Sequence, residues 1–256
     1  MIFFFSATGN SQYAAQRVAA ATGDSVVSIG VAMKDRHFAF DVTEDERIGF
    51  VVPTFAWTLP GVVASFINKL ELTGYRDKYV YAIFTCGESC GGGPAAIREL
   101  LGRKGIGFSG GFELVTIDNF IVWSTIPSEE EVSRKLKAAD VILDEIIKSV
   151  CAKKSGIISG EYKNLYMPFE CFSSSDGTSK LIVSDDCVGC GLCVMMCPTG
   201  AIKMNEEEGP YWDGECSLCL ACLHRCPVSA IDYGTDTVGK RRWKYPGLIP
   251  QTINKY

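Results

Sequence analysis

Two groups of cysteines near the end of the chain have the spacing that an iron–sulfur cluster requires. Each group follows the pattern C-x2-C-x2-C-x3-C-P, and the second repeats the first after a short spacer. Three thiolates two residues apart on a tight loop can surround three corners of a [4Fe-4S] cube, while neighbouring backbone N–H groups offset the charge of its sulfides. The cysteines are Cys187, Cys190, Cys193 and Cys197 in the first group, and Cys216, Cys219, Cys222 and Cys226 in the second.

The fourth cysteine of each group lies too far along the chain to close the same cube, so we expect it to bind the other cube. We also expect a short helix to begin at this cysteine, after its turn. The predicted ligands are Cys187, Cys190, Cys193 and Cys226 for one cluster, and Cys197, Cys216, Cys219 and Cys222 for the other.

Two other uses of cysteine fit this pattern less well. A zinc ribbon uses four thiolates in two C-x2-C pairs, and this chain has two sets of four, each closed by proline. A disulfide framework requires an oxidising compartment, and such closely spaced cysteines are poor partners for one another. Residues 181 to 234 therefore resemble a clostridial-type ferredoxin domain with two [4Fe-4S] clusters.

Composition limits the remaining possibilities. A chain of 256 residues with 47% hydrophobic content has room for a second, larger domain with its own core. The net charge of −5 disfavours nucleic acid as a partner and suits docking on basic patches of redox partner proteins.

Ile2 to Phe5 is apolar without a basic region before it, so we expect a strand and no signal peptide. No apolar run approaches the roughly 18 residues of a membrane helix, and reduced thiols suggest a cytoplasmic location in a niche with little oxygen.

The first part of the chain alternates short apolar runs with helical patterns, which predicts an α/β fold with a parallel sheet. The predicted strands are residues 2–5, 26–29, 48–52, 79–84 and 112–117, and residues 30–45 are left unassigned. The predicted helices cover residues 10–21, a segment from Pro60, and residues 94–104. A last helix begins at Ser128, which forms a capping box with Glu131, and its apolar face is expected to cover the sheet. That face consists of Val132, Leu136, Ala139, Leu143, Ile146 and Val150.

The turn after the first strand has the composition of a phosphate site. Its hydroxyls and backbone N–H groups lie at a helix N-terminus, where the helix dipole favours an anion. The loop has no lysine, which excludes a Walker A motif and suits a monophosphate ester better than a triphosphate. The loop residues are Ser6, Ala7, Thr8, Gly9, Asn10 and Ser11.

This turn and the five strands resemble flavodoxin over roughly residues 1 to 150. The resemblance implies the strand order 2-1-3-4-5, helices on both faces, and FMN at the carboxyl ends of the strands. An empty or differently occupied phosphate site is the alternative. Flavodoxins usually have aromatic residues in both loops that flank the flavin, but the second loop here is rich in glycine and cysteine, which leaves one ring face more open. The implied flavin contacts are Thr54, Phe55, Ala56 and Trp57 in one loop, and Cys86, Gly87 and Glu88 in the other.

Several other residues could do chemistry, and for most the plainer role is favoured. Trp57 stacks on a flavin ring or, alternatively, covers a domain interface. Cys86 and Cys90 are expected to be buried thiols without redox function. His224 is expected to tune the surroundings of the second cluster motif and not to bind iron. Cys151 and Cys171 are expected to be unpaired thiols, and the sequence from Gly105 to Gly110 has the reverse of the strand-to-helix context of a dinucleotide site, which argues against NAD.

The predicted domain boundaries are residues 1–151 for the FMN domain, 152–180 for a linker, 181–234 for a small α+β ferredoxin domain and 235–256 for a C-terminal tail. The aromatic residues of the linker suggest that its middle packs against a domain. The basic run at residues 240–244 is expected to be a solvated tail that lies across an acidic domain.

As a whole, the chain resembles the flavodoxin–ferredoxin fusion proteins of anaerobic microbes. The resemblance implies electron transfer between FMN and a redox partner protein through two [4Fe-4S] clusters. Two alternatives remain open. One is an FMN and iron–sulfur oxidoreductase that reduces a small quinone, disulfide or nitro compound near Glu88 and Cys90. The other is a ferredoxin attached to a flavin-free docking domain.

Overall fold

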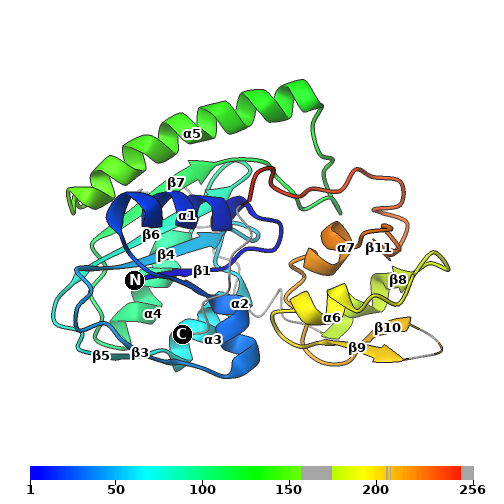
Figure 1. The fold of residues 1–256 in the computed structure, drawn as a ribbon, viewed down its shortest axis with the longest axis horizontal. Coiled ribbons are helices and arrows are strands. Elements are labelled where there is room, and N and C mark those ends of the chain that lie inside the picture. The colour runs from blue at the N-terminus through cyan, green and yellow to red at the C-terminus, as the bar shows by residue number, and fades with distance from the viewer. Residues whose placement is uncertain (157–174, 206, 208, 249–256) are drawn as a thin grey trace.

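A parallel sheet lies at the centre of the larger, amino-terminal domain. The computed structural model describes residues 1–156, 175–205, 207 and 209–248 (Figure 1). Within these residues, the sheet has the order β2-β1-β4-β6-β7. This confirms the predicted order 2-1-3-4-5, because β3 and β5 lie outside this sheet. Its strands are β1 (Ile2–Phe4), β2 (Val26–Ser28), β4 (Arg47–Pro53), β6 (Tyr79–Cys86) and β7 (Gly110–Val115).

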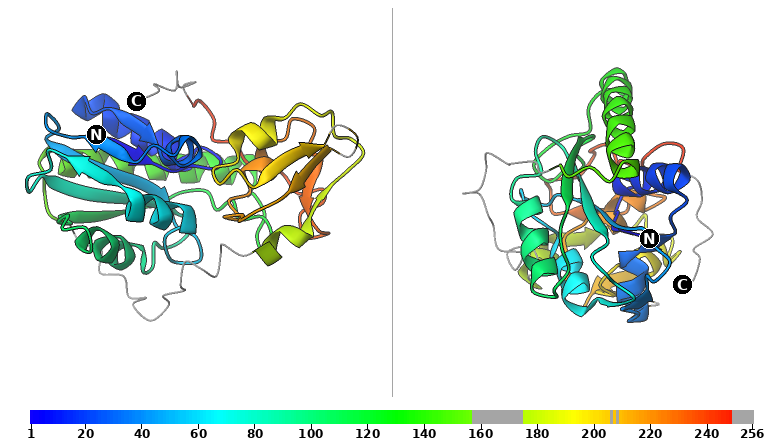
Figure 2. Two further views of the ribbon diagram at one scale, coloured as in Figure 1. Left: turned by 90° about the horizontal axis from the view of Figure 1, so that it is seen from below. Right: turned by 90° about the vertical axis from the view of Figure 1, so that its left-hand side faces the viewer.

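Helices cover both faces of the sheet (Figures 1 and 2). Successive side chains of a strand point to opposite faces, so Phe3 and Phe5 belong to one apolar core and Ile2 and Phe4 to the other. The first core is closed by α2 (Ile29–Asp35), α3 (Gly61–Lys69) and α4 (Gly93–Gly102). The second is closed by α1 (Asn10–Thr22) and α5 (Glu129–Cys151).

The unassigned residues 30–45 contain two short elements. Helix α2 is capped by Ser28, whose Oγ accepts the N–H of Val31 at 3.4 Å. Strand β3 (Ala39–Asp41) then pairs in parallel with β5 (Glu71–Thr73). Helix α2 has only seven residues, and only the middle residue of β3 is buried, so neither element shows a clear apolar pattern in the sequence.

Helix α5 extends over both parts of the molecule. The predicted cap is confirmed, because Ser128 Oγ accepts the N–H of Glu131 at 3.2 Å. The Glu131 carboxylate instead pairs with Arg134, so the box is not closed. From Ala139 onward the apolar face packs on the sheet, whereas Val132 belongs to an apolar cluster of the C-terminal region. None of the described helices is long and apolar enough to cross a bilayer.

The C-terminal module consists of two antiparallel strand pairs and two short helices, as expected for a small α+β domain. Strand β8 (Leu181–Val183) pairs with β11 (Ile231–Tyr233), and β9 (Ile202–Asn205) pairs with β10 (Gly209–Trp212). The expectation that a helix begins at each fourth cysteine was wrong. Helices α6 (Leu192–Met196) and α7 (Ala221–Arg225) end immediately before Cys197 and Cys226. A short 3-10 helix, η2 (Ser175–Lys180), precedes the module.

The segment after the module lies across the sheet domain, as predicted for residues 240–244, but the prediction that it is solvated was wrong at Trp243. Trp243 is only 3% exposed, and its Nε1 donates to Asn10 Oδ1 at 2.8 Å. Tyr245 stacks on Tyr13 with ring centroids 4.4 Å apart. Lys240 Nζ donates to the carbonyl of Ile121 at 2.7 Å. Residues 235–248 are called the C-terminal strap from here on.

Most of the predicted linker lies outside the described residues. This holds for Cys171 and for the aromatic residues that were expected to pack against a domain, namely Tyr162, Tyr166, Phe169 and Phe172.

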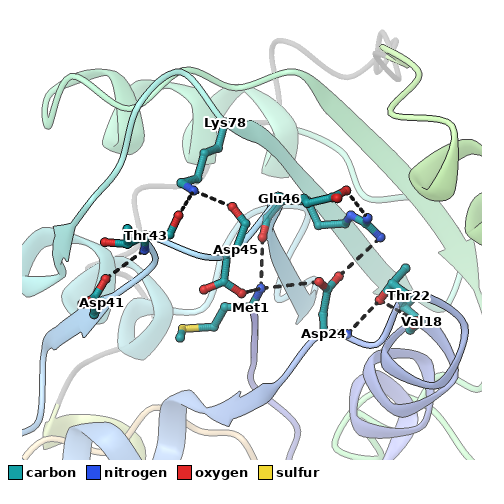
Figure 3. A network of polar contacts seen from close by, with 10 residues as sticks. Met1, Val18, Thr22, Asp24, Asp41, Thr43, Asp45, Glu46 and Lys78 are labelled. Carbon is teal, nitrogen blue, oxygen red and sulfur yellow. Dashed lines mark hydrogen bonds and ion pairs between the residues drawn. The ribbon is translucent and has the colours of Figure 1, made fainter.

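A polar network fastens the amino-terminal edge of the sheet (Figure 3). The Met1 ammonium donates to Asp45 Oδ1 at 2.5 Å and to the carbonyl of Arg47 at 3.0 Å, and it lies 3.8 Å from Asp24. Lys78 Nζ donates to the carbonyl of Thr43 at 2.9 Å. The network therefore lies where the parallel strands β1, β2, β4 and β6 begin. The loops that follow these strands lie at the opposite end of the sheet.

Replacing the buried strap indole tests the connection between the two domains. In Trp243→Phe, Asn10 Oδ1 loses its donor while it remains buried, so we expect a loss of about 1–3 kcal/mol in unfolding free energy. The measurement is the denaturation midpoint of the full chain. Trp123→Phe is the control, because Trp123 is 74% exposed and should change stability by less than about 0.5 kcal/mol. Equal midpoints for both variants would contradict the role of the strap.

Candidate functional site

A cavity of about 200 Å³ lies at the carboxyl edge of the sheet. Its walls come from the loops after β1, β4, β6 and β7, and from the second cysteine motif of the C-terminal module. Figure 2 shows the module beside this end of the sheet. Of the residues predicted to contact FMN, Gly9 alone does not line the cavity. The others do, namely Ser6, Ala7, Thr8, Asn10, Ser11, Thr54, Phe55, Ala56, Trp57, Cys86, Gly87 and Glu88.

The loop after β1 turns into α1 at Gly9. Its φ of +116° favours glycine, and its carbonyl accepts the N–H of Tyr13 at 2.9 Å. A Cβ at Gly9 would lie 2.6 Å from Leu248 and from Tyr245. Gly9 therefore serves the turn and the close approach of the C-terminal strap, which is why it does not border the cavity.

Two hydroxyls of this loop accept hydrogen bonds within the protein and keep their own protons available. Ser6 Oγ accepts the N–H of Gly9 at 3.1 Å, and Thr8 Oγ1 accepts from the side-chain amide of Asn119. The first turn of α1 contains no acidic residue that would repel an anion. Hydroxyl donors at the N-terminus of a 13-residue helix form an environment suited to a phosphate group.

The loop after β4 presents Trp57 through a tight two-residue turn. Phe55 and Thr58 exchange backbone hydrogen bonds of 2.9 and 3.0 Å across this turn. Ala56 and Trp57 both have positive φ, of 43° and 62°. The glycines of the neighbouring loop make the turn possible, because a Cβ at Gly91 would lie 2.5 Å from the Trp57 Cβ. Trp57 is 40% exposed and lines the cavity, so it is accessible to a ligand.

The loop after β6 contributes buried thiols. Cys86 borders the cavity with 6% of its surface exposed, and Cys90 lies behind it with none exposed. Burial raises the pKa of the Cys86 thiol, and burial with the neighbouring Glu113 raises the pKa of Cys90 to about 12. Both thiols are therefore protonated at neutral pH, as expected for cysteines without redox function.

Two segments that sequence reasoning missed also line the cavity. The loop after β7 contributes Asn119, Phe120 and Trp123. The rings of Phe120 and Trp123 meet edge to face, with their centroids 5.0 Å apart. The second cysteine motif contributes Leu218 and Leu220. The prediction that one face of the flavin ring is more open considered only the loops after the third and fourth predicted strands. It therefore omitted these aromatic and apolar residues.

The two sets of thiols occupy different places in the module. The cysteines of the first predicted set all line one small cavity, namely Cys187, Cys190, Cys193 and Cys226. Within the part of the chain that the structure describes, the walls of this cavity come from the C-terminal module alone. The N–H of Ala230 points to Cys226 Sγ at 3.3 Å. Among the described residues, no group of three or more His, Cys, Asp and Glu side chains is arranged to hold a single metal ion.

The second predicted set lies deeper. Burial and the neighbouring thiols of Cys219, Cys216 and Cys197 raise the pKa of Cys222. Burial and electrostatic effects within the same set also raise the pKa values of Cys216 and Cys219. The N–H of Leu218 points to Cys216 Sγ at 3.4 Å. N–H groups directed at sulfur suit thiolates that bind an iron–sulfur cluster.

His224 connects this motif to the sheet domain. Its Nδ1 accepts the backbone N–H of Trp243 at 3.0 Å, so Nε2 carries the proton and donates to the carbonyl of Asn119 at 2.8 Å. Burial lowers the pKa of His224 to about 4, which keeps the ring neutral. Arg225 Nε also donates to the carbonyl of Ala7 at 2.7 Å. Helix α7 is thus hydrogen-bonded to two loops that border the cavity.

Comparison of the sequence with known proteins finds matches in both parts of the chain. Residues 1–88 match the model of the flavodoxin domain family, and residues 181–203 match that of the 4Fe-4S binding domain family. The chain is 33% identical over 72 residues to the pyruvate synthase subunit PorD of Methanocaldococcus jannaschii, which covers 26% of this chain and 84% of that protein. It is 34% identical over 61 residues to the iron–sulfur subunit of the nitrate-inducible formate dehydrogenase of Escherichia coli K12, covering 20% of each. The chain therefore spans only a fifth of that subunit's length.

Among solved structures, the flavodoxin of Streptococcus pneumoniae TIGR4 is similar to the larger domain. The match has 18% sequence identity and a TM-score of 0.34, and it covers 57% of this chain and 97% of that structure.

Alkylation tests the burial of the cavity thiols. At pH 8, a thiol with a pKa of about 12 has about one part in 10⁴ in the reactive thiolate form, so Cys90 should resist iodoacetamide, as should the buried Cys86. Cys151 is exposed and serves as the control within the same chain. We expect peptide mass spectrometry of the native protein to show modification at Cys151 at least about tenfold faster than at either buried thiol. Rapid modification of Cys90 would contradict this assignment.

Paired substitutions test the two predicted ligand sets. If ligands cross between the motifs as predicted, Cys190→Ser with Cys226→Ser removes one cluster and should leave about four iron atoms per chain. Cys190→Ser with Cys197→Ser damages both clusters and should leave almost none. Iron content after anaerobic purification separates the two. The reverse pattern would show that each motif binds its own cluster.

Proposed function

We propose that this chain, a fusion of a flavodoxin domain and a 4Fe-4S ferredoxin-type domain, passes electrons between FMN and a redox partner protein through two [4Fe-4S] clusters. One observation carries this proposal: a single cavity is bordered by the loop from Ser6 to Ser11, called the phosphate-type loop from here on, and by Cys219 of the second cluster motif. A flavin in this cavity would be next to a cluster ligand. FMN exchanges one or two electrons and each cluster exchanges one, so together they can connect a two-electron reaction to a one-electron carrier.

The residues present fit FMN. Ser6 and Thr8 keep hydroxyl protons for the phosphate at the start of α1, and Trp57 and Trp123 offer apolar surface for the ring. Thr54 supports a polar ligand, because its Oγ1 is buried at the cavity and has no hydrogen-bond partner among the described residues. Such a hydroxyl is costly unless a ligand satisfies it.

The residues also fit two clusters. The four thiols of the first predicted set line a small cavity, and the four of the second set are near enough to influence one another electrostatically. A backbone N–H group points at sulfur in each set. The chain holds the module against the sheet domain through α7 and the C-terminal strap. Electron transfer between the two parts then does not depend on a diffusional encounter. The proposed partner is a redox protein, and the net charge of −5 suits docking on its basic patches.

The alternative of a reductase at Glu88 and Cys90 has less support. Glu88 borders the cavity, but Cys90 is completely buried and does not line it. A small acceptor in the cavity would therefore meet Glu88 without a reactive thiol.

The cofactor content tests the proposed function directly. We expect the protein purified without oxygen to release one FMN with about eight iron atoms and eight sulfides per chain. About eight irons without flavin, even after incubation with FMN, would contradict the proposal and support the flavin-free docking domain.

A pair of threonines tests the FMN site more finely. Thr54 and Thr58 both have a buried, unpartnered hydroxyl among the described residues, but only Thr54 borders the cavity. In Thr54→Val the ligand loses a hydrogen bond, so the Kd for FMN should rise about five- to tenfold. Thr58→Val is the matched control and should leave the Kd unchanged. Fluorescence titration measures both values, and equal effects would place FMN elsewhere.

A further inference from the structure

The two cysteine motifs have the same spacing, and each has two residues with positive φ between its first three cysteines. The motifs have different residue types at these two positions. Gly189 and Gly191 of the first motif have φ of +64° and +71°. The corresponding positions of the second motif are Leu218 and Leu220, with φ of +47° and +56°. A leucine in this conformation is strained, because its Cβ approaches the backbone, whereas glycine is not.

The surroundings of the two motifs differ in the same way. A Cβ at Gly189 or Gly191 would meet nothing within 4 Å, so this loop has open space around it. Leu218 and Leu220 both line the cavity at the sheet edge, and Leu220 is only 4% exposed. At these two backbone positions, the chain thus has a large apolar side chain in the motif that borders the cavity and glycine in the other motif. Strained residues that the surrounding structure maintains are a mark of functional sites.

The neighbouring contacts hold this loop against the sheet domain. Cys219, between the two leucines, packs against the apolar core formed by β1, β4 and β6 with α2, α3 and α4. Arg225 bonds to the carbonyl of Ala7 in the phosphate-type loop, and His224 bonds to the carbonyl of Asn119. By contrast, the cavity of the first set has no lining residue from the described part of the sheet domain, and Cys190 is exposed next to Val188, which is 63% exposed.

We propose that Leu218 and Leu220 contact the flavin ring and form the wall of its cavity on the side of the second motif. The set of Cys197, Cys216, Cys219 and Cys222 is then the one beside the flavin, and the set that contains Cys190 is the remote one, open toward a partner. This inference rests on the proposed function, since it assigns a place in the flavin site to particular residues of the ferredoxin-type domain.

Exchanging residues between the two motifs tests the wall. In the full chain with its clusters, Leu218→Gly with Leu220→Gly should raise the Kd for FMN at least about tenfold, because apolar contact with the ring is lost. Leu218→Met with Leu220→Met keeps the side-chain volume and should restore the Kd to within about twofold of the original. Gly189→Leu is the matched control in the first motif and should leave the Kd unchanged. Fluorescence titration with FMN gives each value, and iron content shows whether the clusters are intact.

Two single substitutions test which thiol set is near the flavin. In Cys190→Ser the second set remains, and adding FMN should shift the reduction potential of the remaining cluster, followed by its electron paramagnetic resonance signal. In Cys219→Ser the first set remains, and its potential should not change with FMN.

The outcomes separate this inference from the proposed function. If the unmodified protein binds no FMN, the proposed function fails. If it binds FMN but the glycine exchange leaves the Kd unchanged, or FMN shifts the potential only in Cys219→Ser, the proposed function stands and the inference is overturned.

Discussion

The side-chain amide of Asn10 joins three segments that are far apart in the sequence. Its Oδ1 accepts the indole N–H of Trp243, and its Nδ2 donates to the carbonyl of Ile117 at 2.9 Å. Asn10 begins α1, Ile117 follows β7, and Trp243 lies in the C-terminal strap. An amide that is buried with both partners satisfied becomes costly when either partner is lost. The phosphate-type loop, the loop after β7 and the strap therefore depend on one another, and the shape of the cavity depends on all three.

Backbone strain gathers around the same cavity. Ala56 and Trp57 on the sheet side and Leu218 and Leu220 on the module side all have positive φ without being glycine. Each such residue costs of order 1–3 kcal/mol, so its neighbours must hold it in place. On the sheet side the close approach of Gly91 does this, and on the module side the bonds of α7 to the sheet domain do so. The strain on both sides is thus maintained by packing between segments and not by local preference.

The sequence was informative wherever a local pattern determines structure. The resemblance to flavodoxin implied the order of the strands. Alternating strands and helices predicted only that the sheet is parallel, because a parallel sheet leaves its apolar runs and crossover helices visible along the chain. The loop after the first strand could be placed at the cavity for the same reason. Leu218 and Leu220 could not be placed, because they reach the cavity only through the packing of the module against the sheet domain. Phe120 and Trp123 follow β7, so they reach the same carboxyl ends of the strands, but the predicted flavin contacts did not include the loop after the fifth predicted strand. Trp243 was misinterpreted because charged neighbours made its segment look solvated.

Identical spacing in the two motifs does not produce identical surroundings. Cys197 and Cys222 of the second set are buried, whereas Cys190 of the first set is exposed. The reduction potential of an iron–sulfur cluster depends on solvent exposure and on hydrogen bonds to sulfur. Clusters bound by these two sets would therefore differ in potential, because Cys219 of the second set packs against the sheet domain and Cys190 of the first set is exposed. A symmetric ligand pattern placed against an asymmetric surface is enough to distinguish an inner cluster from an outer one, without any change in the ligands themselves.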